Sequence, residues 1–203
     1  SRAYLGLGRA LTLAEAGKDP RPEIEDTQAE LAGMNGIFDM ILRLARIEAG
    51  ADGAKFAVVD LGPMMEELAE TYQVVAEESG MSFTYEHPEG ERFEINGDAA
   101  MLRQMVVNLL QNAVTHCAAG AAISLRLERD AGGIRLIVTD SGPGIPEAAR
   151  DAVFEPFHRL DPSRGKPGSG LGLALVRAIA ERHGARVRLS DNAPGLRVVV
   201  EFR

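Results

Sequence analysis

The most constraining feature of the sequence is a seven-residue hydrophobic repeat between residues 23 and 49. Apolar side chains recur along it at Ile24, Leu31, Phe38 and Ala45, with Met34 and Ile41 in between. A repeat of this period lines one side of a helix and is typical of helix bundles. It therefore predicts one long helix.

A shorter helix is predicted before it, over residues 3–16. Its apolar residues Tyr4, Leu7, Leu11 and Ala14 are three and four positions apart. Residues 17–22, Gly-Lys-Asp-Pro-Arg-Pro, end that helix because proline cannot continue one. Two helices bury little surface, so we expect the hairpin to pair with a second copy in a dimeric four-helix bundle. The alternative is a hairpin that folds back on the second domain of its own chain.

A division of the chain is expected near residue 53, because residues 50–53, Gly-Ala-Asp-Gly, suit a hinge. The predicted domains are residues 1–53 and 54–203. In the second domain, strand patterns occur at 55–61, 81–88, 121–140 and 185–202, and helix patterns at 61–80, 99–117 and 171–183. Antiparallel strands with three helices predict an α+β fold, a two-layer sandwich.

Composition excludes several classes of protein. The formal net charge of -8 disfavours nonspecific binding of nucleic acid, which depends on Lys and Arg. The single cysteine, Cys117, forms no internal disulfide and no cysteine metal cluster, and it agrees with a reducing compartment. No apolar run approaches the roughly 20 residues of a membrane-spanning helix.

The predicted helix at 99–117 carries an unusual polar stripe. Asn108, Asn112 and Thr115 are spaced four and three residues apart and therefore share one face of the helix. Asparagine is a poor helix former, so two of them beside an apolar stripe need a reason. Exposure to water is one explanation. Coordination of Mg²⁺ by amide oxygens, together with the phosphates of a nucleotide, is the other.

Two glycine-rich segments have similar alternatives. Residues 140–146, Asp-Ser-Gly-Pro-Gly-Ile-Pro, follow a strand and suit either a surface turn or a nucleotide pocket. Residues 168–176, Gly-Ser-Gly-Leu-Gly-Leu-Ala-Leu-Val, lead into a helix, where glycines and free N–H groups can receive phosphate. They match neither a Walker loop nor a Rossmann fingerprint. Between the two, residues 153–169 are rich in proline, glycine and charge, which indicates a functional lid or a mobile segment.

Four segments in this order resemble the N, G1, F and G2 boxes of bacterial sensor histidine kinases: NLLQN, DSGPGIP, FEPFHRL and GSGLGLAL. ILRLARIEAG, residues 41–50, is similar to the end of the dimerisation and phosphotransfer hairpin of that family. The resemblance covers nearly the whole chain. The wider superfamily includes gyrase, mismatch-repair proteins and the ninety-kilodalton heat-shock chaperone, but the hairpin and the F box favour the kinase branch.

The resemblance implies an ATP site. Asp140 would accept a hydrogen bond from the adenine amine, and Gly142 and Gly144 would leave room for the base. Asn112, with Asn108, would hold Mg²⁺ on the phosphates. The implied ATP-binding residues are Asn108, Asn112, Thr115, His116, Asp140, Gly142, Gly144, Ile145, Phe157, Arg159, Gly168, Ser169, Gly170, Leu171 and Gly172.

Residues 157–168 would form the ATP lid, from which Arg159, Arg164 and Lys166 could reach phosphate. Thr115 and His116 stand where the family often has Lys followed by Tyr or His. The missing lysine removes one phosphate contact, whereas His116 keeps a ring that can line the pocket.

The phosphoacceptor histidine is the larger departure. The family has it near the start of the first hairpin helix, but the four histidines here all lie in the second domain, at positions 87, 116, 158 and 183. His183 falls at a helix C-terminus, where cationic side chains are favoured. No catalytic histidine is therefore assigned within the chain. We expect the acceptor, the sensor domain and any membrane attachment to lie upstream.

The expected function follows from these features. The chain would be the cytoplasmic catalytic portion of a sensor histidine kinase, would bind ATP with Mg²⁺ and would form a homodimer. Its phosphate would pass to a histidine and then to an aspartate of a response regulator receiver domain. One alternative is a noncatalytic phosphotransfer or scaffold protein with a degenerate ATP domain. Another is a serine kinase of the anti-sigma-factor type, which should lack the long hairpin.

Overall fold

A computed structural model describes residues 2–50, 53–88, 90–130, 132–160 and 169–203 of the protein. The chain separates into two compact units, residues 1–43 and 44–203. The units part within the second helix, upstream of the division expected at residue 53, which remains a prediction for the functional domains. Each unit is described by itself.

The first unit is a helical hairpin. Helix α1 spans Arg2–Glu15 and helix α2 begins at Arg21 and continues to Glu48, outside the first unit. Both predicted helices are confirmed, and the link between them begins at Gly17 with a φ of 65°. Pro22 lies in the first turn of α2, where the absence of an amide proton costs no hydrogen bond.

The two helices touch through small side chains. Ala3 and Ala10 are each only 5% exposed, and Gly6 lies between them on the same face of α1. A Cβ atom added at Gly6 would lie 2.3 Å from Oγ1 of Thr27, which is itself buried on α2. Gly6 is therefore required for close approach, which explains a glycine inside a helix.

The larger apolar side chains of the hairpin point away from this contact. Tyr4 is 80% exposed, Leu11 65% and Phe38 62%. The predicted stripe continues over further exposed residues of α1 and α2: Leu7, Leu31, Met34, Ile37 and Ile41. The hairpin thus presents an apolar surface that its own two helices do not cover.

The second unit is built on a five-stranded sheet with the order β2-β4-β5-β7-β6. Its strands are β2 (Ser82–Glu86), β4 (Ala122–Asp130), β5 (Gly133–Asp140), β6 (Arg186–Asp191) and β7 (Leu196–Phe202). All neighbouring strands are antiparallel except β2 and β4. The pair of β2 and β4 departs from the antiparallel pattern of the other strands, because β3 and helix α4 lie between the two strands in the chain and return it in the same direction.

A second, two-stranded sheet was not predicted. Strand β1 (Ala57–Asp60) pairs with β3 (Glu94–Gly97), and the pairing is extended by a hydrogen bond from the Leu61 amide to the Phe93 carbonyl at 3.0 Å. β3 is four residues long and carries Glu94 and Asn96, so it lacks the run of β-branched residues that marks a strand.

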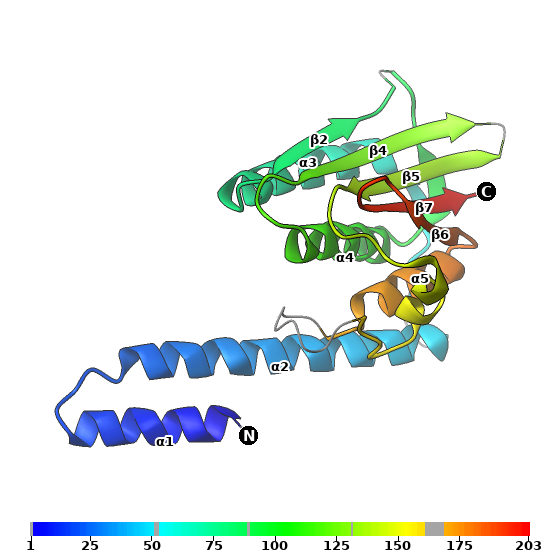
Figure 1. The fold of residues 1–203 in the computed structure, drawn as a ribbon. Helices are drawn as coiled ribbons and strands as arrows, with labels where there is room; N and C mark the ends of the chain where they lie inside the picture. Colours follow the sequence, from blue (N-terminus) through cyan, green and yellow to red (C-terminus); the bar gives the residue numbers. More distant parts are fainter. Residues whose placement is uncertain (1, 51–52, 89, 131, 161–168) are drawn as a thin grey trace. The chain divides into compact units, whose positions relative to one another are not determined.

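Helices α3 (Leu61–Glu78), α4 (Ala99–His116) and α5 (Gly172–Arg182) cover one face of the five-stranded sheet (Figure 1). The alternating burial along β7 agrees with one covered face. Asp98 caps α4 as predicted, since its Oδ1 accepts from the amides of Ala100 and Met101. The α+β sandwich is confirmed. Within the described part of the chain, no helix combines the length and apolar character that a membrane crossing requires.

Asp60 gives a test of this architecture. Its Oδ1 accepts from the Gly62 amide in the first turn of α3 and from the Phe93 amide before β3, both at 3.1 Å. We expect Asp60→Ala to lower the free energy of unfolding by about 1–2 kcal/mol, because two amides lose their acceptor. Urea denaturation measures the change. Asp60→Asn keeps an oxygen at the same place and should cost clearly less; equal losses in both variants would contradict this role.

Candidate functional site

Asp140, the last residue of β5, is the only buried acidic side chain among the described residues, at 8% exposure. Its Oδ1 accepts hydrogen bonds from the amides of Gly142 at 2.8 Å and Leu196 at 3.2 Å. No donor in the described residues lies within hydrogen-bond distance of Oδ2. The carboxylate is thus fixed through one oxygen, and the other is available to a donor from outside the chain.

The turn between β6 and β7 holds the backbone of Asp140. The side-chain amide of Asn192 donates to the Asp140 carbonyl at 2.9 Å. Gly195, with a φ of 114°, approaches so closely that an added Cβ would lie 1.8 Å from that carbonyl oxygen. Sequence reasoning missed Asn192 and Gly195; their signal was a Pro-Gly turn between two strands, which is common enough to pass unnoticed.

Gly142 and Gly144 are glycines for reasons of space. A Cβ atom at Gly142 would lie 2.7 Å from Sγ of Cys117, the residue that ends α4. Gly144 has a φ of 68°, and a Cβ there would lie 2.9 Å from the Gly195 carbonyl oxygen. The segment after Asp140 is therefore packed against the end of α4 on one side and the β6–β7 turn on the other. Ile145 follows it, half-buried, and its carbonyl accepts from Nε of Arg150.

The polar face of α4 is half-buried at Asn108, Asn112 and Thr115. Asn108 accepts from Gln104 through Oδ1 at 3.1 Å, while its buried Nδ2 has no partner in the described residues. Thr115 accepts from Gln111. Asn112 forms no side-chain hydrogen bond to any described residue. Asn112 can therefore offer its carbonyl oxygen to a metal ion, whereas Asn108 as it lies offers an N–H donor, which suits a phosphate oxygen or water.

The F segment and the start of α5 are joined through Gly170. The Phe157 amide donates to the Gly170 carbonyl at 3.0 Å. Gly170 has a φ of 70°, and a Cβ there would lie 2.7 Å from the His158 carbonyl oxygen. Phe157 also has a positive φ of 66° and is 60% exposed. The structure thus brings together two predicted segments that are separated by residues 161–168.

The N-terminus of α5 differs from those of α3 and α4. Asp60 and Asp98 cap those two helices, but Leu171 occupies the equivalent position in α5 and supplies no capping oxygen. Oγ of Ser169 accepts from the Leu171 amide, at 3.3 Å. Gly172 has no atom within 4 Å of an added Cβ, so its lack of a side chain leaves open space beside uncapped N–H groups. This arrangement suits an anion.

The remaining predicted residues are less informative. His116 and Arg159 are exposed, at the end of α4 and after Phe157. Gly168, Arg164 and Lys166 lie outside the described residues, as does most of the predicted lid. α4 and α5 pack side by side, so the asparagine face and the glycine-rich start of α5 belong to neighbouring helices.

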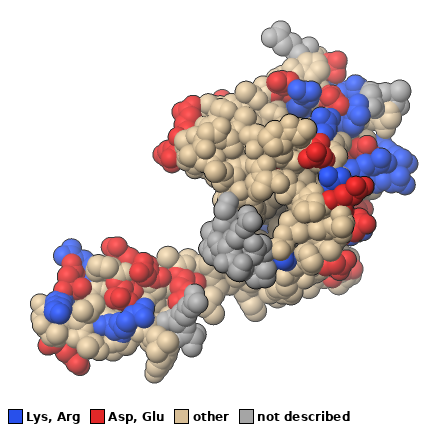
Figure 2. Space-filling model, in the orientation of Figure 1, with Lys and Arg blue, Asp and Glu red and all other residues tan. Residues whose placement is uncertain are grey.

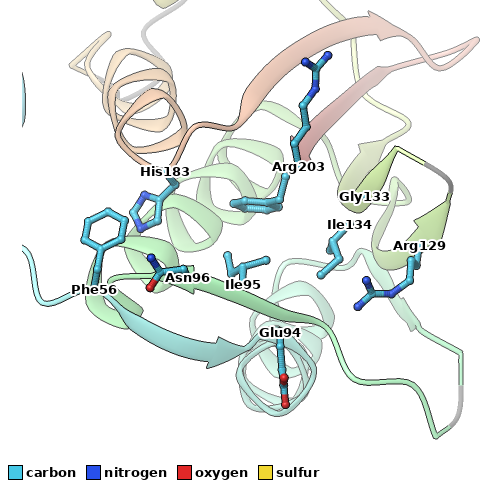
Figure 3. Close-up of a pocket in the computed structure, with 10 residues that line it drawn as sticks. Phe56, Glu94, Ile95, Asn96, Arg129, Gly133, Ile134, His183 and Arg203 are labelled. Atoms are coloured by element: carbon cyan, nitrogen blue, oxygen red, sulfur yellow. The ribbon is translucent and has the colours of Figure 1, made fainter.

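A pocket of about 440 Å³ lies at the other end of β5 from Asp140. Figure 3 shows it between β3 and the ends of the sheet strands, with Phe56, Ile95, Asn96, Ile134 and His183 around it. None of the predicted ATP-site residues lines it. Sequence reasoning gave no signal for this pocket, because its residues come from six separate segments.

Charge on the sheet unit is largely balanced. In Figure 2, Lys and Arg gather on one side of that unit with Asp and Glu directly among them. Arg126 pairs with Glu86 at 2.7 Å, and Arg135 pairs with Glu128 at 3.0 Å. On the face shown in Figure 2, basic side chains are thus interspersed with acidic ones.

The comparisons with known proteins agree with this geometry. Residues 97–203 match the family described as histidine kinase-, DNA gyrase B-, and HSP90-like ATPase. The signal transduction histidine-protein kinase/phosphatase MprB of Mycobacterium sp. (strain KMS) is 35% identical over 171 residues, which are 84% of this chain and 32% of that protein. The chain therefore spans about a third of the length of this curated relative.

Two solved structures are similar to the whole fold or much of it. A structure of the mycobacterial sensor histidine kinase MprB has a TM-score of 0.62 at 31% identity, covering 72% of this chain and 95% of that one. A structure of full-length ShkA in complex with AMPPNP has a TM-score of 0.78 at 27% identity, covering 90% of this chain and 38% of that one.

Gly195 is the sharpest structural test of the site. We expect Gly195→Ala to destabilise the protein by about 3 kcal/mol or more, because the methyl group collides with the Asp140 carbonyl in a backbone conformation that alanine avoids. Thermal and urea unfolding measure the loss. Gly172→Ala is the matched control and should leave stability unchanged or slightly higher. A well-folded Gly195→Ala protein of normal stability would disprove the packing described here.

Proposed function

Because the chain belongs to the histidine kinase-, DNA gyrase B-, and HSP90-like ATPase family, and within it to the sensor histidine kinases of two-component systems, we propose that it binds Mg-ATP and supplies the γ-phosphate for transfer to a histidine. The phosphate would then pass to an aspartate of a response regulator receiver domain. The activity of the whole protein is part of this proposal, since the chain spans only about a third of the relative MprB.

The observation that supports ATP binding best is that only one carboxylate oxygen of Asp140 is hydrogen-bonded within the described chain. One oxygen is held by two backbone amides, and the second is free to accept a hydrogen bond. The exocyclic amine of adenine is a donor. A fixed carboxylate oxygen therefore accepts from adenine but repels a base that has a carbonyl at the same ring position. The neighbouring glycines keep this part of the surface free of side chains that would cover the base.

The phosphates would lie at the start of α5, with Mg²⁺ between them and α4. Uncapped amides of the first turn and the open space at Gly172 suit phosphate oxygens. Asn112 would supply a carbonyl oxygen to the metal. Asn108 would donate to a phosphate oxygen or to water on the metal. To act as a direct ligand, Asn108 would have to rotate its amide and give up the hydrogen bond from Gln104. Bound Mg²⁺ would neutralise phosphate charge, and the chain would contribute positioning.

The accepting histidine would lie outside these residues. All four histidines follow α2 in the chain, and α1 carries none. We therefore assign no catalytic histidine here, and we expect the chain alone not to autophosphorylate on the usual residue. Its setting would be cytoplasmic, with any membrane attachment through segments outside the sequence.

The hairpin would form the dimer. Its outward apolar residues, with Tyr4, Leu11 and Phe38 each more than half exposed, need a cover. A second copy of the same hairpin supplies a matching stripe and would complete a four-helix bundle. The two long helices also argue against the anti-sigma type of serine kinase.

A noncatalytic scaffold with a degenerate ATP domain is the competing function. Calorimetric titration with ATP, in the presence and absence of Mg²⁺, separates the two. We expect saturable binding that strengthens with Mg²⁺; no binding at millimolar ATP would favour the scaffold.

For adenine recognition the decisive variant is Asp140→Asn. An amide oxygen can still serve the Gly142 and Leu196 amides, so the fold should persist, but the second position becomes an N–H donor facing the donor of the base. We expect ATP affinity to fall roughly 100-fold or more, measured by calorimetry, with an unchanged circular dichroism spectrum. Wild-type affinity in this variant would remove Asp140 from the site.

Asn112→Ala tests the metal. We expect the affinity for Mg-ATP to fall about tenfold or more, while the affinity for ATP in excess EDTA changes little, because only the metal loses a ligand. Gln111→Ala, on the exposed side of the same helix, is the control. An equal loss with and without Mg²⁺ would assign Asn112 to the nucleotide and not to the metal.

Phe38→Asp tests the bundle. A carboxylate in the apolar stripe would be desolvated on dimerisation, so we expect the variant to sediment as a monomer at concentrations where the wild type is a dimer. Ala29→Asp introduces the same charge on the same helix outside the stripe and should remain dimeric. If both variants stay dimeric, the hairpin is not the interface.

A further inference from the structure

His183 has both ring nitrogens engaged. Its Nδ1 donates to the Ile179 carbonyl at 2.7 Å, and its Nε2 accepts from the Asp98 amide at 3.0 Å. A carbonyl only accepts and an amide only donates, so this arrangement uses Nδ1 as the donor of the ring and Nε2 as its acceptor.

The face of the same ring is also in use. Phe56, in the segment that enters the sheet unit, stacks on it with a centroid distance of 4.9 Å and an interplanar angle of 28° (Figure 3). The guanidinium of Arg182 lies over the Phe56 ring, 5.3 Å from its centre. Beside Phe56, the Lys55 amide donates to Oδ2 of Asp98 at 2.8 Å.

Room for the ring is made by Gly97. A Cβ atom at that position would lie 2.7 Å from Cδ2 of His183. A helix cap alone would need only the Nδ1 bond to Ile179. It would need neither a glycine under the ring, nor an aromatic partner on its face, nor an amide from another helix at Nε2.

These contacts meet at one point of the nucleotide-binding unit. Asp98 begins α4, which carries Asn108 and Asn112. His183 follows the last residue of α5, which begins at Gly172. In the entering segment, Lys55 is hydrogen-bonded to Asp98 and Phe56 stacks on His183. The cluster thus joins the ends of α4 and α5 that lie away from the proposed metal and phosphate ligands.

We infer that His183 is a positioning residue that fixes the chain entering the nucleotide-binding unit to the first turn of α4 and the last turn of α5. Because His183 fixes them, Lys55 and Phe56 would move together with α4 and α5, the two helices that hold the proposed nucleotide ligands. A change in those helices on nucleotide binding is thereby passed to the residues that follow the hairpin. This transmission of a change, the coupling, rests on the proposed function. The holding of the entering segment by His183, the fixation, does not.

The fixation is tested by amide hydrogen exchange on the 203-residue protein without nucleotide. His183→Phe keeps a ring beside Phe56 but removes the acceptor, and we expect exchange at the Asp98 amide to accelerate roughly tenfold or more. His183→Gln keeps an acceptor but loses the stack, and should protect Asp98 while exchange at Lys55 accelerates. His87→Phe is the matched control, because His87 stacks on Tyr85 in the same way, at 5.1 Å, elsewhere in the unit.

The coupling is tested with Phe56→Trp, which introduces the chain's only tryptophan. We expect Mg-ATP to change its fluorescence, and the change to disappear in Phe56→Trp/His183→Ala although calorimetry still detects nucleotide binding. Unchanged Asp98 exchange in His183→Phe would overturn the fixation. Bound nucleotide without a fluorescence response in Phe56→Trp would overturn the coupling. If calorimetry detects no nucleotide binding at all, the proposed function and the coupling fail together, and the exchange experiment alone decides the fixation.

Discussion

The nucleotide-binding unit depends on the way in which Asp140 is held. The residue ends the central strand β5, and its carbonyl and carboxylate receive bonds from Asn192, Gly142 and Leu196. These partners come from the strand's own continuation and from the β6–β7 turn. Burial of a carboxylate costs free energy, but the Gly142 and Leu196 amides offset part of that cost by donating to Oδ1, while Asn192 holds the backbone carbonyl. The result is a fixed acceptor at the end of a sheet.

The three helices of this unit differ in whether a side chain caps their N-termini. Asp60 and Asp98 supply oxygens to the first turns of α3 and α4, so those turns need nothing further. α5 begins after Leu171 and has no such oxygen. Its first turn therefore keeps its attraction for an anion, and the glycines around it leave the approach open. Of the three helices, α5 alone lacks a side-chain cap, and it lies next to α4, whose Asn108 Nδ2 has no partner among the described residues.

Sequence reasoning predicted the long helices, the capping aspartate and the order of the site segments, because periodicity and glycine positions are local signals. It did not predict β3, whose pairing with β1 is set by the tertiary fold. It also missed Gly195 and the contacts of His183. Both depend on partners far along the chain, since Gly195 is constrained by Asp140 and Nε2 of His183 accepts from the Asp98 amide. Contacts of this kind leave no periodic trace.

The contact between Gly6 and Thr27 has a mechanical consequence for the hairpin. Ala3 and Ala10 lie on the same face of α1 as Gly6, and Arg9 pairs with Glu23 of α2 at 2.8 Å. A side chain at position 6 would displace Oγ1 of Thr27 or force the helices apart. Any substitution there would act as a wedge and widen the hairpin.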